Sequence, residues 1–243
     1  MKLLILGGTS EAAGLARALA EYPDVQVINS LAGRTATAPV LPGTVRMGGF
    51  GGAEGLARYL AETGINRVID ATHPFAARIS AHAAEACAGL GLPRLRLERP
   101  QWPRQAGDHW VEVADMATAA ARVAGLGRRA FLTVGIGEVA AFAAVTDVHF
   151  LVRLIAEQAL PLCDYEVVTG KGPFSAEAER NLMRAHAIQT VVTKASGGAA
   201  TYGKIAAARE LGLPVLMVQR PTKPEGICVA DVASAVAWAI SPA

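Results

Sequence analysis

The stretch NRVIDATHPFA, residues 66–76, contains an apolar run, a polar turn and the start of an Ala-rich segment. The run up to Asp70 predicts a buried strand, and the Ala-rich residues from about 75 to 89 predict a helix. Thr72 could cap that helix, and Pro74 is tolerated in a first helical turn, where its missing N–H costs little. The same polar groups could instead line a ligand site at the carboxyl end of the strand. The stretch therefore predicts a strand–helix unit and leaves the role of its turn open.

Strand-length apolar runs alternate with helical segments on both sides of this stretch. KLLIL at 2–6 precedes an expected helix near 11–21, and TVVTK at 190–194 precedes another near 201–211. Strands that are apolar throughout predict a parallel sheet with helices on both faces. The alternation is broken at ERPQWPRQAGDHW, residues 98–110, whose prolines, glycine and polar residues predict a linker. We therefore expect an α/β protein of two Rossmann-like lobes, residues 1–100 and 101–243, with a ligand cleft between them.

An internal repeat supports two halves of the same kind. GLPRLRLERP at 91–100 matches GLPVLMVQRP at 212–221 at Gly, Leu, Pro, Leu, Arg and Pro without a gap. At the same offset Thr72 falls on Thr193, and both residues close an apolar strand before a polar turn. Because all strand–helix units look alike, the repeat suggests common ancestry without establishing it. The lobe on which the last expected helix packs, residues 232–240, is left open.

Composition and charge limit the kinds of partner. Hydrophobic residues make up 52% of the chain and charged residues 18%, which is typical of a compact globular protein. The net charge is only +2 and there is no run of Lys or Arg, which argues against nucleic acid. No apolar stretch is long enough to cross a bilayer, and MKLLILGG has no cleavage site after it, so we expect a cytoplasmic protein without membrane contact. The cysteines and histidines show no metal-ligand spacing, so no metal site is expected.

The turn GGTSEAAG, residues 7–14, is the first candidate binding site. Two glycines allow a tight turn and let a phosphate approach the backbone N–H groups at the start of a helix. At the end of the next strand an acid would bind the ribose of NAD, but here an arginine with hydroxyl neighbours favours the 2′-phosphate of NADP. The candidate cofactor-binding residues of these two turns are Gly7, Gly8, Thr9, Ser10, Ser30, Arg34 and Thr35. In MGGFGG, residues 47–52, Phe50 could lie flat against a ligand, or the loop could simply be mobile.

Three turns of the second half add further candidates. Gly135 and Gly137 follow a strand and permit close approach of a cofactor or substrate. Lys171 lies between two glycines ahead of a helix. The densest polar cluster combines small donors with two cations, as an anion-binding turn requires. Its members are Lys194, Ser196, Gly197, Gly198, Thr201 and Lys204.

His73 is the one candidate for acid–base chemistry in the opening stretch. It could act as a general acid or base, donate a hydrogen bond to a ligand, or serve the structure alone. Neither a Ser/His/Asp arrangement nor a GxSxG turn is present, so hydrolysis lacks support.

Together these motifs resemble the precorrin-6A reductase family, in order and over nearly the whole chain. The resemblance implies NADPH-dependent reduction of one macrocycle double bond in cobalamin (vitamin B12) biosynthesis, from precorrin-6A to precorrin-6B or between the cobalt forms. The motifs that carry it are GGTSEA, GGFGG, DATHPFA, LPRLRLERPQW, GPFSAEAE and TKASGGAATYGKIAAARELGLPVLMVQRP.

The resemblance also implies roles for individual residues. Thr72 would face the cofactor, and Phe50, His73 and Thr201 the tetrapyrrole-derived substrate. The proton would come from His73, Lys194 or water, and no metal is required. Transient contact with neighbouring enzymes of the pathway is a further expectation. The cations expected to meet the substrate carboxylates are Lys171, Lys194, Lys204, Arg78 and Arg153.

Two other kinds of protein are alternatives. A dehydrogenase for a sugar or ketone would use a Tyr-x-x-x-Lys pair, but Tyr202 precedes Lys204 by two residues, the wrong spacing for one helical face. A two-lobed sensor without catalysis would usually be exported or carry a DNA-binding helix pair, and neither a signal peptide nor room for such a pair is apparent.

Overall fold

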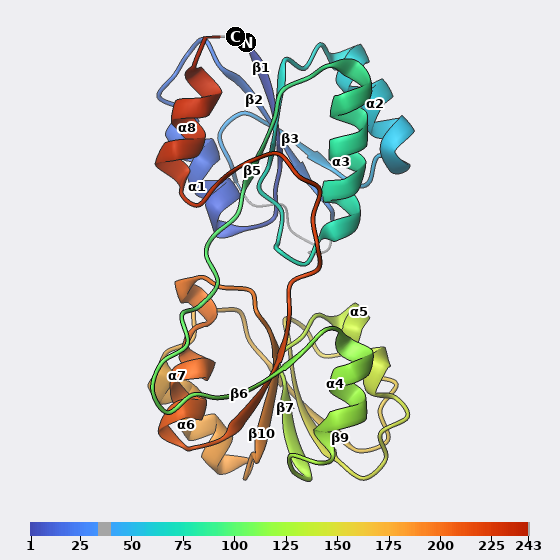
Figure 1. The fold of residues 1–243 in the computed structure, drawn as a ribbon, viewed down its shortest axis with the longest axis vertical. Coiled ribbons are helices and arrows are strands. Elements are labelled where there is room, and N and C mark those ends of the chain that lie inside the picture. The colour runs from blue at the N-terminus through green and yellow to red at the C-terminus, as the bar shows by residue number, and fades with distance from the viewer. Residues whose placement is uncertain (34–39, 243) are drawn as a thin grey trace. The chain divides into compact units, whose positions relative to one another are not determined.

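The computed structural model describes residues 1–33 and 40–242. The chain forms two compact units, each described by itself (Figure 1). The first unit contains residues 1–100 and the segment from Pro221 onward, and the second contains Gln101–Arg220. Among the described residues, no helix combines the length and apolarity needed to cross a bilayer.

The first unit is a six-stranded parallel sheet in the order β12-β5-β4-β1-β2-β3, with helices on both faces (Figure 1). Its strands are β1 (Lys2–Leu6), β2 (Gln26–Leu31), β3 (Thr44–Met47), β4 (Arg67–Asp70), β5 (Arg94–Leu97) and β12 (Ile227–Val229). Its helices are α1 (Ser10–Leu19), α2 (Gly52–Thr63), α3 (Ala77–Leu90) and α8 (Val232–Ile240).

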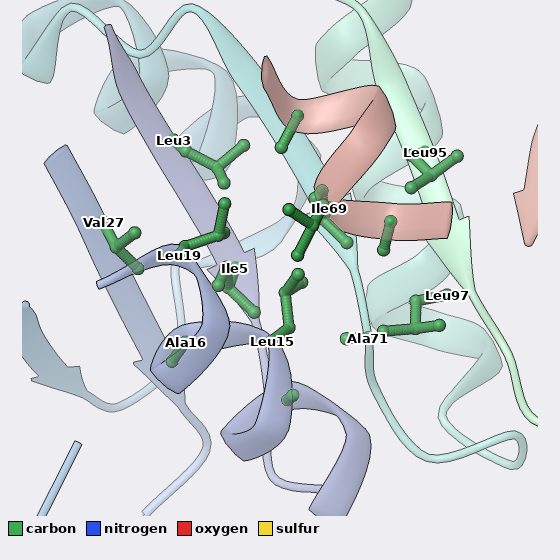
Figure 2. Close-up of a cluster of buried hydrophobic side chains, with 14 residues drawn as sticks. Leu3, Ile5, Leu15, Ala16, Leu19, Val27, Ile69, Ala71, Leu95 and Leu97 are labelled. Atoms are coloured by element: carbon green, nitrogen blue, oxygen red, sulfur yellow. The ribbon is translucent and has the colours of Figure 1, made fainter. Parts of the chain in front are cut away.

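Residues 3–6 of β1 are buried on both faces of the sheet, which explains the unbroken apolar run LLIL. Leu3 and Ile5 pack with α1 and α8, and Figure 2 shows this cluster. Leu4 and Leu6 point to the opposite face and pack with α2 and α3. Because side chains alternate along a strand, a strand covered on both faces needs apolar residues at every position.

The second unit repeats this plan in the order β6-β11-β10-β7-β8-β9, again all parallel. Helices α6 and α7 cover one face around Phe131, Leu151 and Val191. Its strands are β6 (His109–Val113), β7 (Arg129–Leu132), β8 (His149–Leu154), β9 (Tyr165–Thr169), β10 (Thr190–Lys194) and β11 (Pro214–Val218). Its helices are α4 (Met116–Val123), α5 (Ile136–Val139), α6 (Ala176–Ala185) and α7 (Gly203–Glu210), with short 3₁₀ turns at Ala140–Phe142 and Ala199–Thr201.

Both sheets have the Rossmann strand order, but their sixth strands are exchanged. By chain order β6 would complete the first sheet and β12 the second, whereas each is found in the other sheet. The helix after each exchanged strand begins in the same way, with Asp115 or Asp231 accepting a hydrogen bond from a backbone N–H three residues on. The equivalence of the two halves therefore extends beyond the repeat visible in the sequence.

Because of this exchange, the second unit does not extend over residues 101–243 as expected. The last segment returns to the first unit because β12 pairs with β5, Ile227 lying opposite Leu95, and because α8 buries Ala235 and Ala239 against α1. The expected boundary near residue 100 agrees with the division of the chain, and the expected end of the second lobe does not.

Candidate active site

The turn between β1 and α1 has the backbone of a phosphate-binding turn. Gly8 has φ of +108°, and a Cβ added there would meet no atom within 4 Å, so the space beside it is open. A Cβ on Gly7 would come within 3.3 Å of Ala12, so a glycine here lets α1 approach the sheet closely. Thr9 caps α1, accepting a hydrogen bond from the Ala12 N–H at 3.1 Å. The first turn of α1 thus presents its N–H groups beside an open glycine.

The polar turn after β4 is tied to this first turn. Thr9 donates its hydroxyl hydrogen to the Ala71 carbonyl at 2.8 Å. The fully buried Asp70 accepts hydrogen bonds from the Thr72 N–H at 3.1 Å and the Thr72 hydroxyl at 2.6 Å. Thr72 does not cap α3, which begins at Ala77 without a side-chain cap, so that alternative is excluded. Asp70 thus anchors the backbone of this turn.

His73 is held by the same turn. Its Nδ1 accepts a hydrogen bond from the Phe75 N–H at 3.2 Å, which assigns the ring hydrogen of the neutral imidazole to Nε2. Protonating Nδ1 would place two N–H groups against each other. The ring is therefore arranged to donate a hydrogen bond through Nε2.

Arg46 on β3 is a functional candidate that the sequence did not indicate. It lies opposite Ser30 of β2 in the parallel register, and its guanidinium donates to the Ser30 hydroxyl at 2.8 Å. Phe50, a candidate to lie flat against a ligand, stacks on this guanidinium, which lies 3.8 Å from the ring centroid. The predicted residues Arg34 and Thr35 lie outside the described residues.

In the second unit, the side chain of Glu138 binds the turn between β7 and α5. Glu138 accepts a hydrogen bond from the Gly135 N–H at 2.8 Å. Its carboxylate also pairs with Lys194, at 2.7 and 3.0 Å from the two oxygens. Glu138, which the sequence did not single out, thus joins Gly135 and Lys194. The space beside Gly137 is open.

The loop after β10 is fixed through its carbonyl groups. Trp102 donates to the Gly198 carbonyl at 2.7 Å, and Arg220 donates to the carbonyls of Ala195 at 2.8 Å and Ser196 at 3.0 Å. Gly197 and Gly198 have φ of +68° and +82°, which non-glycine residues rarely adopt. The predicted anion-binding turn therefore has a defined backbone conformation.

Lys204 lies in a buried charge cluster next to this loop. It is only 6% exposed, and its Nζ lies 5.5 Å from the centre of the Trp102 ring. Nearby, Arg153 pairs with the buried Glu179 and stacks on Phe174. Burial lowers the pKa of Lys204 to about 8, with Arg153 and Lys194 acting in the same direction and Glu179 opposing. Such a perturbed amine marks a candidate functional group.

Two other predicted cations are exposed side chains. Lys171 and Arg78 are both exposed, Lys171 on the loop between β9 and α6 and Arg78 on α3. Among the described residues, no group of three or more His, Cys, Asp or Glu side chains is placed to hold a metal ion.

Two Rossmann-type sheets, the first with an open glycine turn at the start of α1, have the architecture that is typical of the dinucleotide-binding class. The chain belongs to the precorrin-6x reductase family CbiJ/CobK, whose model matches residues 2–240.

Individual relatives agree with this assignment over at least 90% of their length. The precorrin-6A reductase of Rhodococcus erythropolis is 46% identical, covering 98% of this chain and 96% of its own. A solved structure of the CobK precorrin-6A reductase is 42% identical, with a TM-score of 0.91 over 98% of this chain and 95% of that one. The cobalt-precorrin-6A reductase of Priestia megaterium is 29% identical over 90% of each chain. Membership of this family excludes both alternatives, the sugar or ketone dehydrogenase and the sensor.

Proposed function

We propose that this chain uses NADPH to reduce one macrocycle double bond of precorrin-6A, giving precorrin-6B, in cobalamin biosynthesis. The observation that carries the cofactor assignment is the open turn at Gly8, beside the N-terminus of the ten-residue helix α1. Greater similarity to the Rhodococcus enzyme than to the Priestia cobalt-precorrin-6A reductase favours the cobalt-free substrate. NADPH use is consistent with a cytoplasmic protein, and contact with neighbouring pathway enzymes stays a prediction.

The cofactor fits the first unit better than the second. The Gly8 turn has room for a phosphate, and the neutral hydroxyl of Thr9 caps its helix. The carboxylate of Glu11, in the first turn of α1, is paired with Arg99 at 2.8 Å. At the corresponding turn of the second unit, Glu138 takes the Gly135 N–H, and α5 has only four residues. A carboxylate at this place would repel a phosphate. The further predicted cofactor contacts, at Gly137, Ser196, Gly197 and Gly198, would then serve the reacting end of the cofactor or the substrate.

The second unit offers positive charge for the substrate carboxylates. Arg153, Lys194 and Lys204 stand against Glu138 and Glu179, so three cations and two carboxylates leave one positive charge in excess among these described residues. An anionic ligand would balance this charge. Thr201, Lys171 and Arg78 remain predicted contacts.

The protein residues orient the reactants and supply a proton. When bound, NADPH supplies the hydride, which is the chemistry of the cofactor and not of the protein. His73 would hold a ligand by donating from Nε2. Loss of that hydrogen would leave an imidazolate, so His73 is a poor acid, and we assign proton delivery to Lys194 or water.

Oxidation of NADPH by the purified protein in the presence of precorrin-6A tests the reaction. We expect loss of the reduced nicotinamide absorbance together with a change in the macrocycle spectrum. The activity with NADH should be lower than that with NADPH by about tenfold or more. Neither signal should appear without the substrate. No NADPH oxidation with authentic precorrin-6A would refute the proposal.

The substitution Gly8→Ala should weaken NADPH binding about tenfold or more in a fluorescence titration. Its methyl group would occupy the space where a phosphate meets the N–H groups of α1. Gly91→Ala is the matched control, because Gly91 also has positive φ and open space but ends α3. Equal loss of NADPH affinity in both variants would attribute the effect to strain and remove the support for this phosphate site.

His73→Ala should lower kcat/KM about three- to tenfold, the effect of one neutral hydrogen bond. His73→Gln should recover most of this loss, because its amide N–H can replace the Nε2–H. The dependence of kcat/KM on pH should keep its shape in the glutamine variant. If His73→Gln were as impaired as His73→Ala and also lost an ionisation near the pKa of histidine, His73 would be the proton donor after all.

A further inference from the structure

The end of β2 is where a Rossmann unit distinguishes the two nicotinamide cofactors. An acid at this position binds the ribose hydroxyl groups of NAD, and a cation accommodates the 2′-phosphate of NADP. Here Asn29, Ser30 and Leu31 end the strand without an acid, and the Asn29 amide donates to the Pro42 carbonyl at 2.8 Å. On the β3 side of the strand, the residue beside Ser30 is Arg46.

The guanidinium of Arg46 is held in one orientation by its surroundings. Besides Ser30, it donates to the carbonyls of Gly48 at 3.1 Å and Gly49 at 3.0 Å. One face lies over Phe50, whose ring meets Tyr59 edge-on with centroids 5.2 Å apart. A guanidinium held by three hydrogen bonds and a stacked ring loses little further freedom when it binds a ligand.

All three of these acceptors are uncharged. Among the described residues Arg46 has no carboxylate partner, whereas Arg99 pairs with Glu11 and Arg209 with Asp108. Three of its five N–H hydrogens are used in these bonds. The Nε hydrogen and one Nη2 hydrogen remain, and such a pair can hold two oxygens of one phosphate.

There is also room for a ligand beside this guanidinium. Arg46 is partly exposed, and a Cβ added at Gly48 or Gly49 would meet no atom within 4 Å. The glycines of this loop thus leave space next to a fixed and uncompensated positive charge.

We propose that Arg46 binds the 2′-phosphate of NADPH and sets the preference for NADPH over NADH. The proposal rests on the proposed function, in which the first unit holds the cofactor. It assigns to Arg46 the role that the sequence suggested for Arg34.

The test is calorimetric titration with two fragments of the cofactor, adenosine 2′,5′-bisphosphate and 5′-AMP. The wild type should bind the bisphosphate about ten- to a hundredfold more tightly than 5′-AMP. In Arg46→Met this ratio should fall to near one, while the affinity for 5′-AMP stays the same. Arg46→Lys keeps the charge but not the paired hydrogens, so it should retain an intermediate ratio.

Arg58→Met is the matched control, since Arg58 is exposed on the neighbouring helix α2, and its ratio should equal that of the wild type. A ratio that falls in Arg34→Met but not in Arg46→Met would overturn the inference and keep the cofactor. If the wild type bound neither fragment nor NADPH, the proposed function itself would fail. If Arg46→Met does not fold, Arg46→Lys provides the test. An affinity ratio in Arg46→Lys equal to that of the wild type would contradict the proposal.

Discussion

Replacing Lys204 by methionine is expected to raise the free energy of unfolding at pH 7 by about 2–3 kcal/mol. In the folded protein burial lowers the pKa of this amine from 10.5 to about 8, so keeping it charged is unfavourable. At 1.36 kcal/mol for each pKa unit, the difference corresponds to about 3 kcal/mol. Arg153 and Lys194 add to this cost and Glu179 reduces it. Methionine has a similar length, no charge and no need for a partner.

The pH dependence of this gain has a definite sign. Between pH 8 and 10.5 the unfolded chain binds more protons at Lys204 than the folded protein, so the wild type gains stability as the pH rises through that range. The advantage of Lys204→Met should therefore be full below about pH 8 and vanish by about pH 10.5. Urea unfolding of both proteins at a series of pH values measures it. Lys171→Met, at an exposed lysine, should show no such difference.

The same substitution should impair catalysis. If Lys204 balances a substrate carboxylate, its loss should raise KM for precorrin-6A about tenfold or more and leave the affinity for NADPH unchanged. A variant that is more stable but less active is the expected signature of a charge kept for function. A Lys204→Met protein less stable than the wild type at pH 7 would show that the folded state stabilises the ammonium, and it would contradict this account.

Most of the fold could be predicted from the sequence because its signals are local. The apolar run of β1 and the alternation of strands and helices require only short stretches of chain, and they predict parallel sheets covered on both faces. The glycine turn at Gly8 was predictable for the same reason, since its conformation depends on the residue itself.

The exchange of the sixth strands could not be predicted in this way. Strand β12 has three residues, Ile227–Val229, and its apolar run is too short to indicate a strand. It belongs to the first sheet because it pairs with β5, far away in the sequence. The sequence also predicts a helix near 138–145, whereas α5 ends at Val139 and continues only as a short 3₁₀ turn.

The charged partners in the two candidate sites were hidden for a related reason. Arg46 and Ser30 become neighbours only through the register of β2 and β3, and Glu138 meets Lys194 across 56 residues. A sequence shows which side chains are charged, but pairing depends on which strands are adjacent. Candidate residues on turns could therefore be predicted from the sequence, whereas the side chains that bind those turns could not.

Arg67→Ala is expected to lower the free energy of unfolding by about 3–5 kcal/mol, the largest loss that we predict. Arg67 is 6% exposed at the start of β4, and its guanidinium binds the carboxyl end of α8. It donates to the carbonyls of Trp238 at 2.6 Å, Ala239 at 3.1 Å and Ser241 at 2.7 Å. These carbonyls end a helix and carry partial negative charge, so they take the place of a carboxylate partner.

Without Arg67 the last carbonyls of α8 would lose these hydrogen bonds in a partly buried setting, and a cavity would remain beside Trp238. Urea unfolding measures the loss, and Arg17→Ala, at an exposed arginine of α1, should change stability by less than about 0.5 kcal/mol. Because Arg67 connects β4 to the returning segment, hydrogen exchange should speed up first in the amides of α8. Equal stability of the two variants, or unchanged protection of α8, would mean that the core contacts of Ala235 and Ala239 alone hold this helix on the first sheet.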